Sequence, residues 1–333
     1  PGATHTAAVA SPYEPAPGPA QSSVGTALRH LAVVRVDRYT PIFHSPDDLV
    51  KKIQMLRLLG QATGTCFQRC VGLDAMNATY AVTFEMDRDN GTDYHERFKK
   101  YLSRVQSEDL MLAGAMTDPK GHRMKRPLEQ ADPDQFVRVV EQRPDGVVIR
   151  GAKLHNTGGI NSHEILVLPG QGLQAGEEAY AIACAVPADA PGVVFVFGRQ
   201  SNDTRKLEKG CDIGNTRFGV VGGEAMIVFD DVFVPTERVF MNGEIDHCAT
   251  MVNCFATWHR ANYGGCKGGN ADVLIGATAK MTRILGTDRN SIVKDKLTEM
   301  VHLTETTYAS AIGSSAMGYQ LPCGSFMVDP LLA

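Results

Sequence analysis

Residues 136–150, FVRVVEQRPDGVVIR, contain two short runs rich in β-branched residues, 136–140 and 146–150, on either side of a glycine-containing turn. Runs of this kind, bounded by turn residues, predict β-strands. Similar runs follow at residues 165–168, 179–185, 192–197, 225–229 and 232–235. We therefore expect a mostly β region from about residue 115 to residue 240.

Helical patterns flank this β region on both sides. Ser45-Pro46-Asp47-Asp48 is a helix-start signature, and apolar residues follow it at helical spacing as far as about Leu112, with an interruption near residues 89–92. After Gly243 the pattern turns helical again, most clearly at residues 275–285 and 292–313. The order helical, β, helical predicts an α+β protein.

The two ends of the chain differ from this pattern. Residues 1–42 begin with a stretch rich in Pro, Ala, Gly and Ser, and we expect this segment to be disordered or atypical. Residues 328–333 stop without a cap or a polar tail. The expected domains are a helical domain at 43–114, a β domain at 115–240, and a C-terminal helical domain at 241–333 that is truncated.

Composition narrows the function classes. The 333 residues carry a net charge of -4 and no basic clusters, so we expect no nucleic-acid partner. We also expect no membrane partner, because no apolar run approaches the roughly 18–20 residues that cross a bilayer. Eight cysteines without a signal peptide are more typical of thiols or metal ligands than of disulfides, which predicts a soluble, cytoplasmic protein.

Four residues have the spacing of a metal site. Cys66 and Cys70 are four residues apart, which on a helix is about 40° of rotation. His259 and Cys266 are seven apart, or about two helical turns. Three thiolates and an imidazole suit either a 4Fe-4S cluster or a zinc ion. The alternative is that these are packed core residues, because free cysteine is often buried.

Longer strings carry a family resemblance. CFQRCVG (66–72), GAMTDPKG (114–121), RGAK (150–153) and HRANYGGCK (259–267) together closely resemble the 4-hydroxybutyryl-CoA dehydratases, which also act as vinylacetyl-CoA Δ-isomerases. The resemblance runs from about Phe43 to Ala333. It implies an acyl-CoA dehydrogenase-like fold, FAD as cofactor, an acyl-CoA substrate and a homotetramer.

The resemblance also implies which residues bind the cofactors. The 4Fe-4S ligands would be Cys66, Cys70, His259 and Cys266. The residues that match the family's FAD-binding segments are Met116, Thr117, Asp118, Pro119, Lys120, Arg123, Lys153, Asn156 and Thr157. Without the resemblance, these segments would be interpreted as ordinary turns.

By the same resemblance, Glu224 and Tyr263 are the acid–base residues, His259 is the exchangeable cluster ligand, and Lys267 balances negative charge. The dehydration must remove a β-hydrogen that has no acidifying neighbour. Loss of the α-proton and one electron would make that hydrogen acidic, and a flavin can accept and return the electron. From the sequence alone, Glu224 also fits a surface carboxylate at a strand edge, and Tyr263 fits a packing residue.

Two other functions are compatible with the sequence. A flavin-dependent aromatic monooxygenase of the 4-hydroxyphenylacetate 3-hydroxylase type shares the architecture and a similar Thr-Asp-Pro segment, but has no use for four cluster ligands. The other alternative is an inactive truncated fragment whose cysteines bind zinc or nothing.

Overall fold

The computed structural model of the chain describes residues 40–197 and 223–333. Residues 1–39, most of the segment that we expect to be disordered or atypical, lie outside these ranges. The end of that segment is packed: Thr40 is buried, and its carbonyl oxygen accepts a hydrogen bond from Gln106 Nε2 at 2.8 Å. Ordered packing therefore begins a few residues before Phe43.

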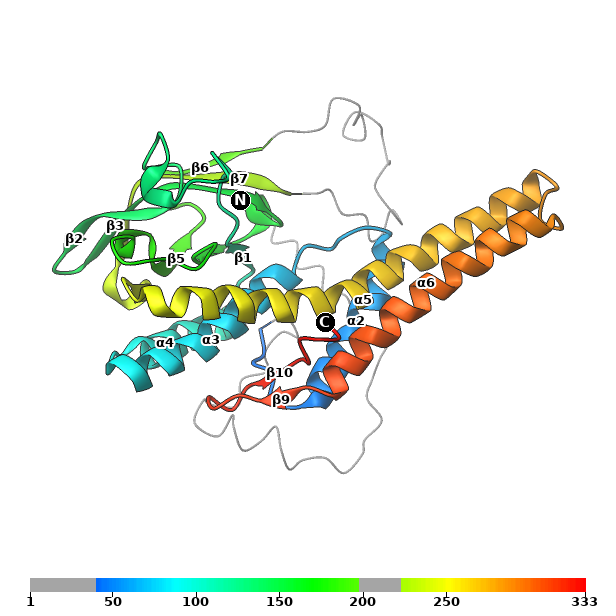
Figure 1. Cartoon of the computed structure of the whole chain (residues 1–333), viewed down its shortest axis with the longest axis horizontal. Helices are drawn as coiled ribbons and strands as arrows, with labels where there is room; N and C mark the ends of the chain where they lie inside the picture. Colours follow the sequence, from blue (N-terminus) through cyan, green and yellow to red (C-terminus); the bar gives the residue numbers. More distant parts are fainter. Residues whose placement is uncertain (1–39, 198–222) are drawn as a thin grey trace. The chain divides into compact units, whose positions relative to one another are not determined.

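The first helical region contains α2 (Pro46–Thr63), α3 (Cys70–Asn90) and α4 (Tyr94–Ser107) (Figure 1). Ser45 caps α2 as predicted, because its side chain accepts a hydrogen bond from the backbone N–H of Asp48. The predicted interruption is confirmed as well. Gly91, with φ of 67°, ends α3 in the left-handed conformation that glycine adopts without strain.

The β region forms two four-stranded sheets. The first has the order β1-β4-β5-β8 and the second the order β2-β3-β7-β6. The strands are β1 (Leu112–Ala115), β2 (Arg138–Arg143), β3 (Gly146–Asn156), β4 (Glu164–Val167), β5 (Ile182–Pro187), β6 (Val193–Val196), β7 (Ala225–Pro235) and β8 (Val239–Asn242). Our prediction did not include β1 and β8. It was also wrong in treating 225–229 and 232–235 as separate strands, because β7 is continuous.

The first sheet is buried on both faces. In β4, Ile165 and Val167 join a hydrophobic cluster shared with the second sheet, whereas Leu166 joins the core shared with the helices. In β5, Cys184 faces the second sheet and Ala183 faces the helices. Alternate residues of a strand point to opposite faces, so the first sheet is the middle layer between the helices and the second sheet.

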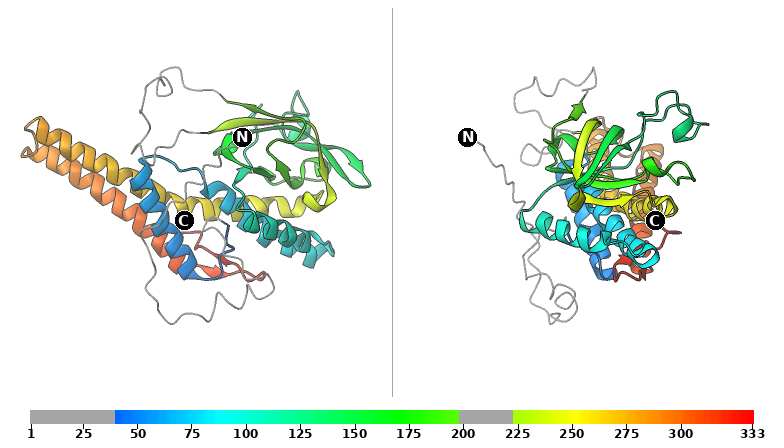
Figure 2. Two further views of the ribbon diagram at one scale, coloured as in Figure 1. Left: turned by 180° about the vertical axis from the view of Figure 1, so that it is seen from behind. Right: turned by 90° about the vertical axis from the view of Figure 1, so that its left-hand side faces the viewer.

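The C-terminal helical region contains α5 (Ile245–Ile284) and α6 (Ser291–Ala316), followed by the short strands β9 (Tyr319–Gln320) and β10 (Phe326–Met327). Figure 2 shows α6 lying beside the later part of α5. Residues 265–272 of α5 pack against α2, and α5 also packs against α3. Trp258 of α5 is fully buried and donates to the carbonyl of Phe326. Within the described ranges, no helix is long and apolar enough to cross a membrane.

The order helical, β, helical is thus confirmed. The limits that we assigned to the three domains, 43–114, 115–240 and 241–333, remain predictions.

Candidate functional site

The two cysteines of the first motif lie in different local structures. Gly64, with φ of 66°, ends α2, and α3 begins only at Cys70. Cys66 therefore lies in a non-helical loop, and our placement of both thiols on one helix was wrong. The physical reason is the left-handed glycine, which stops the helix two residues before Cys66.

Three thiols from distant parts of the sequence are near one another. Burial raises the pKa of Cys70 well above its usual range, and the charges of Asp74, Cys66 and Cys266 raise it further. Burial also raises the pKa of Cys266 to about 11, with a further contribution from Cys66. Cys66, Cys70 and Cys266 are all free thiols, and a charge on Cys66 disfavours ionisation of the other two, so a bound cation is what would stabilise the three thiolates together.

The described residues form no site for a single ion. In residues 40–197 and 223–333, no group of three or more His, Cys, Asp or Glu side chains is close enough to hold one metal ion. Each protein ligand of a four-iron cluster binds a different iron atom, so its donor atoms stand farther apart than those around one ion. The three soft thiols and an imidazole match the donor set of such a cluster.

The second motif lies on one helix, as predicted. His259, Tyr263, Cys266 and Lys267 are all in α5. The ring centroids of His259 and Tyr263 are 5.4 Å apart, and Lys267 Nζ lies 6.0 Å from the Tyr263 ring centroid. Phe255 stacks on the other side of the His259 ring at 5.3 Å. Residues four apart on a helix are neighbours, so aromatic and basic groups form one line along α5. We call this set the α5 line: Phe255, His259, Tyr263 and Lys267.

Sequence reasoning missed three residues next to His259: Asp74, which contacts it, and Asn262 and Lys52, which contact Asp74. Asp74, on α3, is fully buried and lies 2.9 Å from His259 Nδ1. It also accepts hydrogen bonds from Asn262 and from the buried ammonium group of Lys52 on α2. A signal was present in the sequence, since Asp74 is a charged residue four positions after Cys70 in an otherwise apolar run.

The expected FAD-binding segments are joined by Lys153. This residue, on β3, is 2% exposed, and its Nζ lies 3.0 Å from the Met116 carbonyl oxygen, 2.8 Å from the Leu168 carbonyl oxygen and 2.5 Å from Asp118 Oδ1. Three acceptors satisfy all three N–H groups. Burial raises the pKa of Asp118, although Lys153 acts in the opposite direction.

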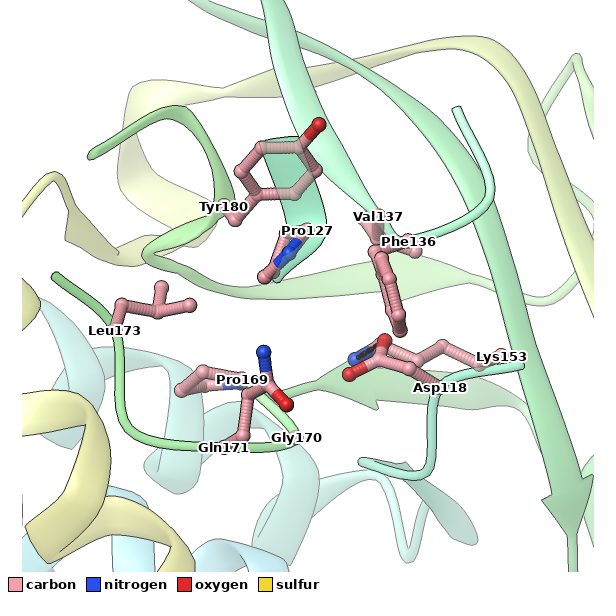
Figure 3. Close-up of a pocket in the computed structure, with 10 residues that line it drawn as sticks. All are labelled: Asp118, Pro127, Phe136, Val137, Lys153, Pro169, Gly170, Gln171, Leu173 and Tyr180. Atoms are coloured by element: carbon pink, nitrogen blue, oxygen red, sulfur yellow. Dashed lines mark hydrogen bonds and ion pairs between the residues drawn. The ribbon is translucent and has the colours of Figure 1, made fainter. Parts of the chain in front are cut away.

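A small pocket adjoins this ion pair. Figure 3 shows Asp118 and Lys153 together on one wall, below the ring of Phe136, with Tyr180 farther away. Of the other residues that we expect to bind FAD, Lys120 and Arg123 are exposed, whereas Asn156 is buried. Asn156 donates to the Lys153 and Ala225 carbonyls, and its own Oδ1 is buried without a hydrogen-bond partner. That oxygen is available to a donor from a bound molecule.

The loop that carries Cys66 also contacts the β region. Gln68 has a left-handed backbone, with φ of 65°, and its side-chain oxygen accepts from the Gly223 N–H at 3.0 Å. Glu224, the next residue, is exposed, with its carboxylate 3.4 Å from the Thr157 hydroxyl group. The structure therefore places Thr157 and Glu224 near the cysteine loop. The roles that we predict for these site residues remain predictions.

The fold is that of the acyl-CoA dehydrogenases. A solved glutaryl-CoA dehydrogenase superposes on 84% of this chain and 63% of its own with a TM-score of 0.56 at 14% identity. The chain belongs to the 4-hydroxyphenylacetate 3-hydroxylase family, whose N-terminal model matches residues 3–241 and whose C-terminal model matches residues 248–333.

Within this family, the chain is similar to proteins with two different chemistries. It is 49% identical to the 4-hydroxybutyryl-CoA dehydratase/vinylacetyl-CoA-Delta-isomerase of Clostridium aminobutyricum over 98% of this chain and 66% of that protein. A solved archaeal 4-hydroxybutyryl-CoA dehydratase from N. maritimus matches with a TM-score of 0.85 and 49% identity, over 89% of this chain and 59% of the other.

The other chemistry is that of an oxygenase. The oxygenase component of 4-hydroxyphenylacetate 3-monooxygenase, solved with FAD, matches with a TM-score of 0.75 at 26% identity, over 89% of this chain and 61% of the other. The chain thus spans about two thirds or less of the length of each of these relatives.

Proposed function

We propose that this protein is a dehydratase that converts 4-hydroxybutyryl-CoA to crotonyl-CoA and also isomerises vinylacetyl-CoA to crotonyl-CoA. The observation that carries the proposal is the gathering of Cys66, Cys70 and Cys266, with His259 on the same helix as Cys266. The 49% identity to a dehydratase of this activity supports it.

A 4Fe-4S cluster would be held by Cys66, Cys70, His259 and Cys266, and FAD by the segments around residues 116–123 and 153–157. When bound, the flavin supplies one-electron chemistry, and the cluster supplies a Lewis acid for the hydroxyl group of the substrate. The buried, unpartnered Oδ1 of Asn156 supports a ligand at the second of these segments.

The side chains of this protein would move the protons. The exposed carboxylate of Glu224, beside the Thr157 hydroxyl, would take a proton from the carbon next to the thioester. The phenol of Tyr263, which faces His259, would give a proton to the departing hydroxyl group. Lys267, close to the Tyr263 ring, would balance the negative charge that develops.

A monooxygenase remains the alternative, because the family name and the 26%-identical oxygenase point to it. Such an enzyme does not use a set of three thiols and an imidazole, which is why the dehydratase is preferred.

We also propose that the protein is cytoplasmic and forms a homotetramer. Large apolar side chains on the outer halves of α5 and α6 support the association: Leu274, Met281, Ile284, Leu285 and Ile292 are exposed. Such residues favour burial between subunits. Light scattering after size exclusion would give the mass in solution, and a monomer at micromolar concentration would contradict the tetramer.

The test of the activity is an anaerobic assay with 4-hydroxybutyryl-CoA, together with quantification of iron, sulfide and FAD. We expect iron with sulfide, and loss of both in Cys66→Ala. Cys323→Ala is the matched control, since Cys323 is also a half-buried free thiol but lies outside the group. Oxygen-dependent hydroxylation of a phenol by an iron-free chain would show a monooxygenase. An active, iron-free Cys66→Ala variant would overturn the cluster mechanism.

A further inference from the structure

Four side chains from three helices form one cluster in which Asp74 contacts the other three. Lys52 comes from α2, Asp74 from α3, and His259 and Asn262 from α5. Asp74 and Asn262 are fully buried, and Lys52 is 5% exposed. A charged carboxylate without solvent requires compensation, and the Lys52 ammonium group, 2.6 Å from Asp74 Oδ1, provides it.

The second oxygen of Asp74 is used differently. Asp74 Oδ2 accepts a hydrogen bond from Asn262 Nδ2 and lies 2.9 Å from His259 Nδ1. A carboxylate in an ion pair has no hydrogen to donate, so the hydrogen of this contact belongs to the imidazole. Nδ1 is then the protonated nitrogen, and the lone pair of the neutral ring is on Nε2.

We infer that Asp74 is a positioning residue: it holds His259 in the Nδ1–H tautomer and fixes its ring, so that Nε2 can bind iron. This inference rests on the proposed function, because it takes His259 as a cluster ligand. No hydrogen bond joins His259 Nε2 to another of the described residues, so Nε2 is free for that bond. In many metal sites, the histidine nitrogen that does not bind the metal donates its hydrogen to a carboxylate, which orients the ring.

The other contacts of His259 support the same orientation. Phe255 stacks on the ring at an interplanar angle of 19°, and Tyr263 meets it edge-on. These aromatic contacts restrict the plane of the ring, but they do not select a tautomer. Among residues 40–197 and 223–333, only the Asp74 contact distinguishes Nδ1 from Nε2.

The test is the tautomer of His259, measured by long-range ¹H–¹⁵N NMR on the reduced, iron-free chain labelled at histidine. His259→Gln assigns the signal by its disappearance. We expect the wild-type chain to show hydrogen on Nδ1. A wild-type signal with hydrogen on Nε2 would overturn the inference, and this measurement requires no Asp74 variant to fold.

Asp74→Asn should reverse the tautomer. The Lys52 ammonium group needs an oxygen acceptor, so the amide oxygen of the new residue should face Lys52 and its NH₂ group should face His259. Nδ1 then becomes an acceptor, and the hydrogen moves to Nε2. An unchanged Nδ1–H signal in a folded Asp74→Asn variant would overturn the inference.

Iron retention is the second readout. After reconstitution with iron and sulfide, Asp74→Asn should hold iron about 10- to 100-fold more weakly against a chelator. The control is Glu164→Gln, which removes one charge from another buried ion pair, with Arg238, in the β region. Equal losses in both variants would mean general destabilisation and would overturn the positioning role. A wild-type chain with the expected tautomer but no uptake of iron would support the role of Asp74 in setting the tautomer and overturn the proposed function.

Discussion

Two buried lysine–aspartate pairs, Lys52–Asp74 among the helices and Lys153–Asp118 in the β region, look alike but have different surroundings. In each pair the lysine side chain is 3% exposed. Each pair also lies near a buried thiol. Burial raises the pKa of Cys70 and of Cys184, and the lysine of the neighbouring pair acts in the opposite direction.

The difference lies in the remaining hydrogen-bonding groups. Lys153 Nζ donates to one carboxylate oxygen and two backbone carbonyls, which uses all three of its N–H groups. This pair therefore joins backbone segments to one another. In the Lys52–Asp74 pair, the aspartate has a second oxygen that the lysine does not use. This oxygen, Oδ2, contacts the His259 and Asn262 side chains of α5. A buried lysine–aspartate pair can therefore stabilise the fold or orient a functional side chain. Which of the two it does depends on whether the lysine or the aspartate has further hydrogen-bonding groups to offer.

The largest effect should come from breaking the pair in the β region. Lys153→Met leaves Asp118 and two carbonyls without their donor, and we expect a loss of about 3–5 kcal/mol in the free energy of unfolding. Urea denaturation measures it. The control, Lys51→Met, removes an exposed pair with Asp47 and should cost less than about 1 kcal/mol. Similar losses in both variants would show that burial does not distinguish these pairs.

A second prediction concerns the close packing of α5 against α2, the helix that carries Lys52. A Cβ atom at Gly269 would lie 2.1 Å from the Arg57 carbonyl oxygen, so Gly269→Ala should cost about 3 kcal/mol and separate the helices. Gly276, on the same helix, has open space around its Cβ position. Gly276→Ala should therefore stabilise the protein by up to about 1 kcal/mol in the same urea experiment. A neutral Gly269→Ala would contradict the close packing.

The thiol beside Lys153 should make stability depend on alkaline pH. Burial raises the pKa of Cys184 from 9.0 to about 12. The unfolded chain then releases this proton first, so stability is lost as pH rises above 9. At pH 10.5 the loss from this group is about 2 kcal/mol. Cys184→Ala should remove that loss, so the stability difference between the variant and the wild type should shift by this amount between pH 8 and pH 10.5. A constant difference would contradict the prediction.

The smallest effect should come from a partly exposed ion pair. Arg57 binds Asp272 through two nitrogens and lies over the Tyr308 ring, 4.4 Å from its centroid. Arg57→Lys keeps the charge but loses the bidentate contact with Asp272 and the stacking on Tyr308. We expect the free energy of unfolding, measured in urea, to fall by about 1 kcal/mol. A cost as large as that of Lys153→Met would remove the distinction between buried and exposed pairs.

Local signals were sufficient for much of the fold. The cap at Ser45 and the stop at Gly91 are properties of neighbouring residues, and both could be recognised in the sequence. Strands β1 and β8 could not, because runs of only three or four apolar residues fit a helix end as well as a strand. Their pairing partners are distant in the sequence. Cys66 was misplaced because helical spacing continues past Gly64 although the backbone does not.

The candidate site was predictable in parts. The spacing of His259 and Cys266 predicted that one helix carries both, and α5 does carry both. The contact between Asp74 and His259 joins residues 185 positions apart, and no local pattern encodes it. A buried charge in an apolar helix does require a partner, and this requirement was the signal available in the sequence.

The continuity of α5 has a structural consequence. From the Gly269 contact with α2, His259 lies about 15 Å along the helix on one side, and Ile284 about 22 Å on the other. One unbroken helix therefore carries the imidazole among packed neighbours and an exposed apolar end beyond them.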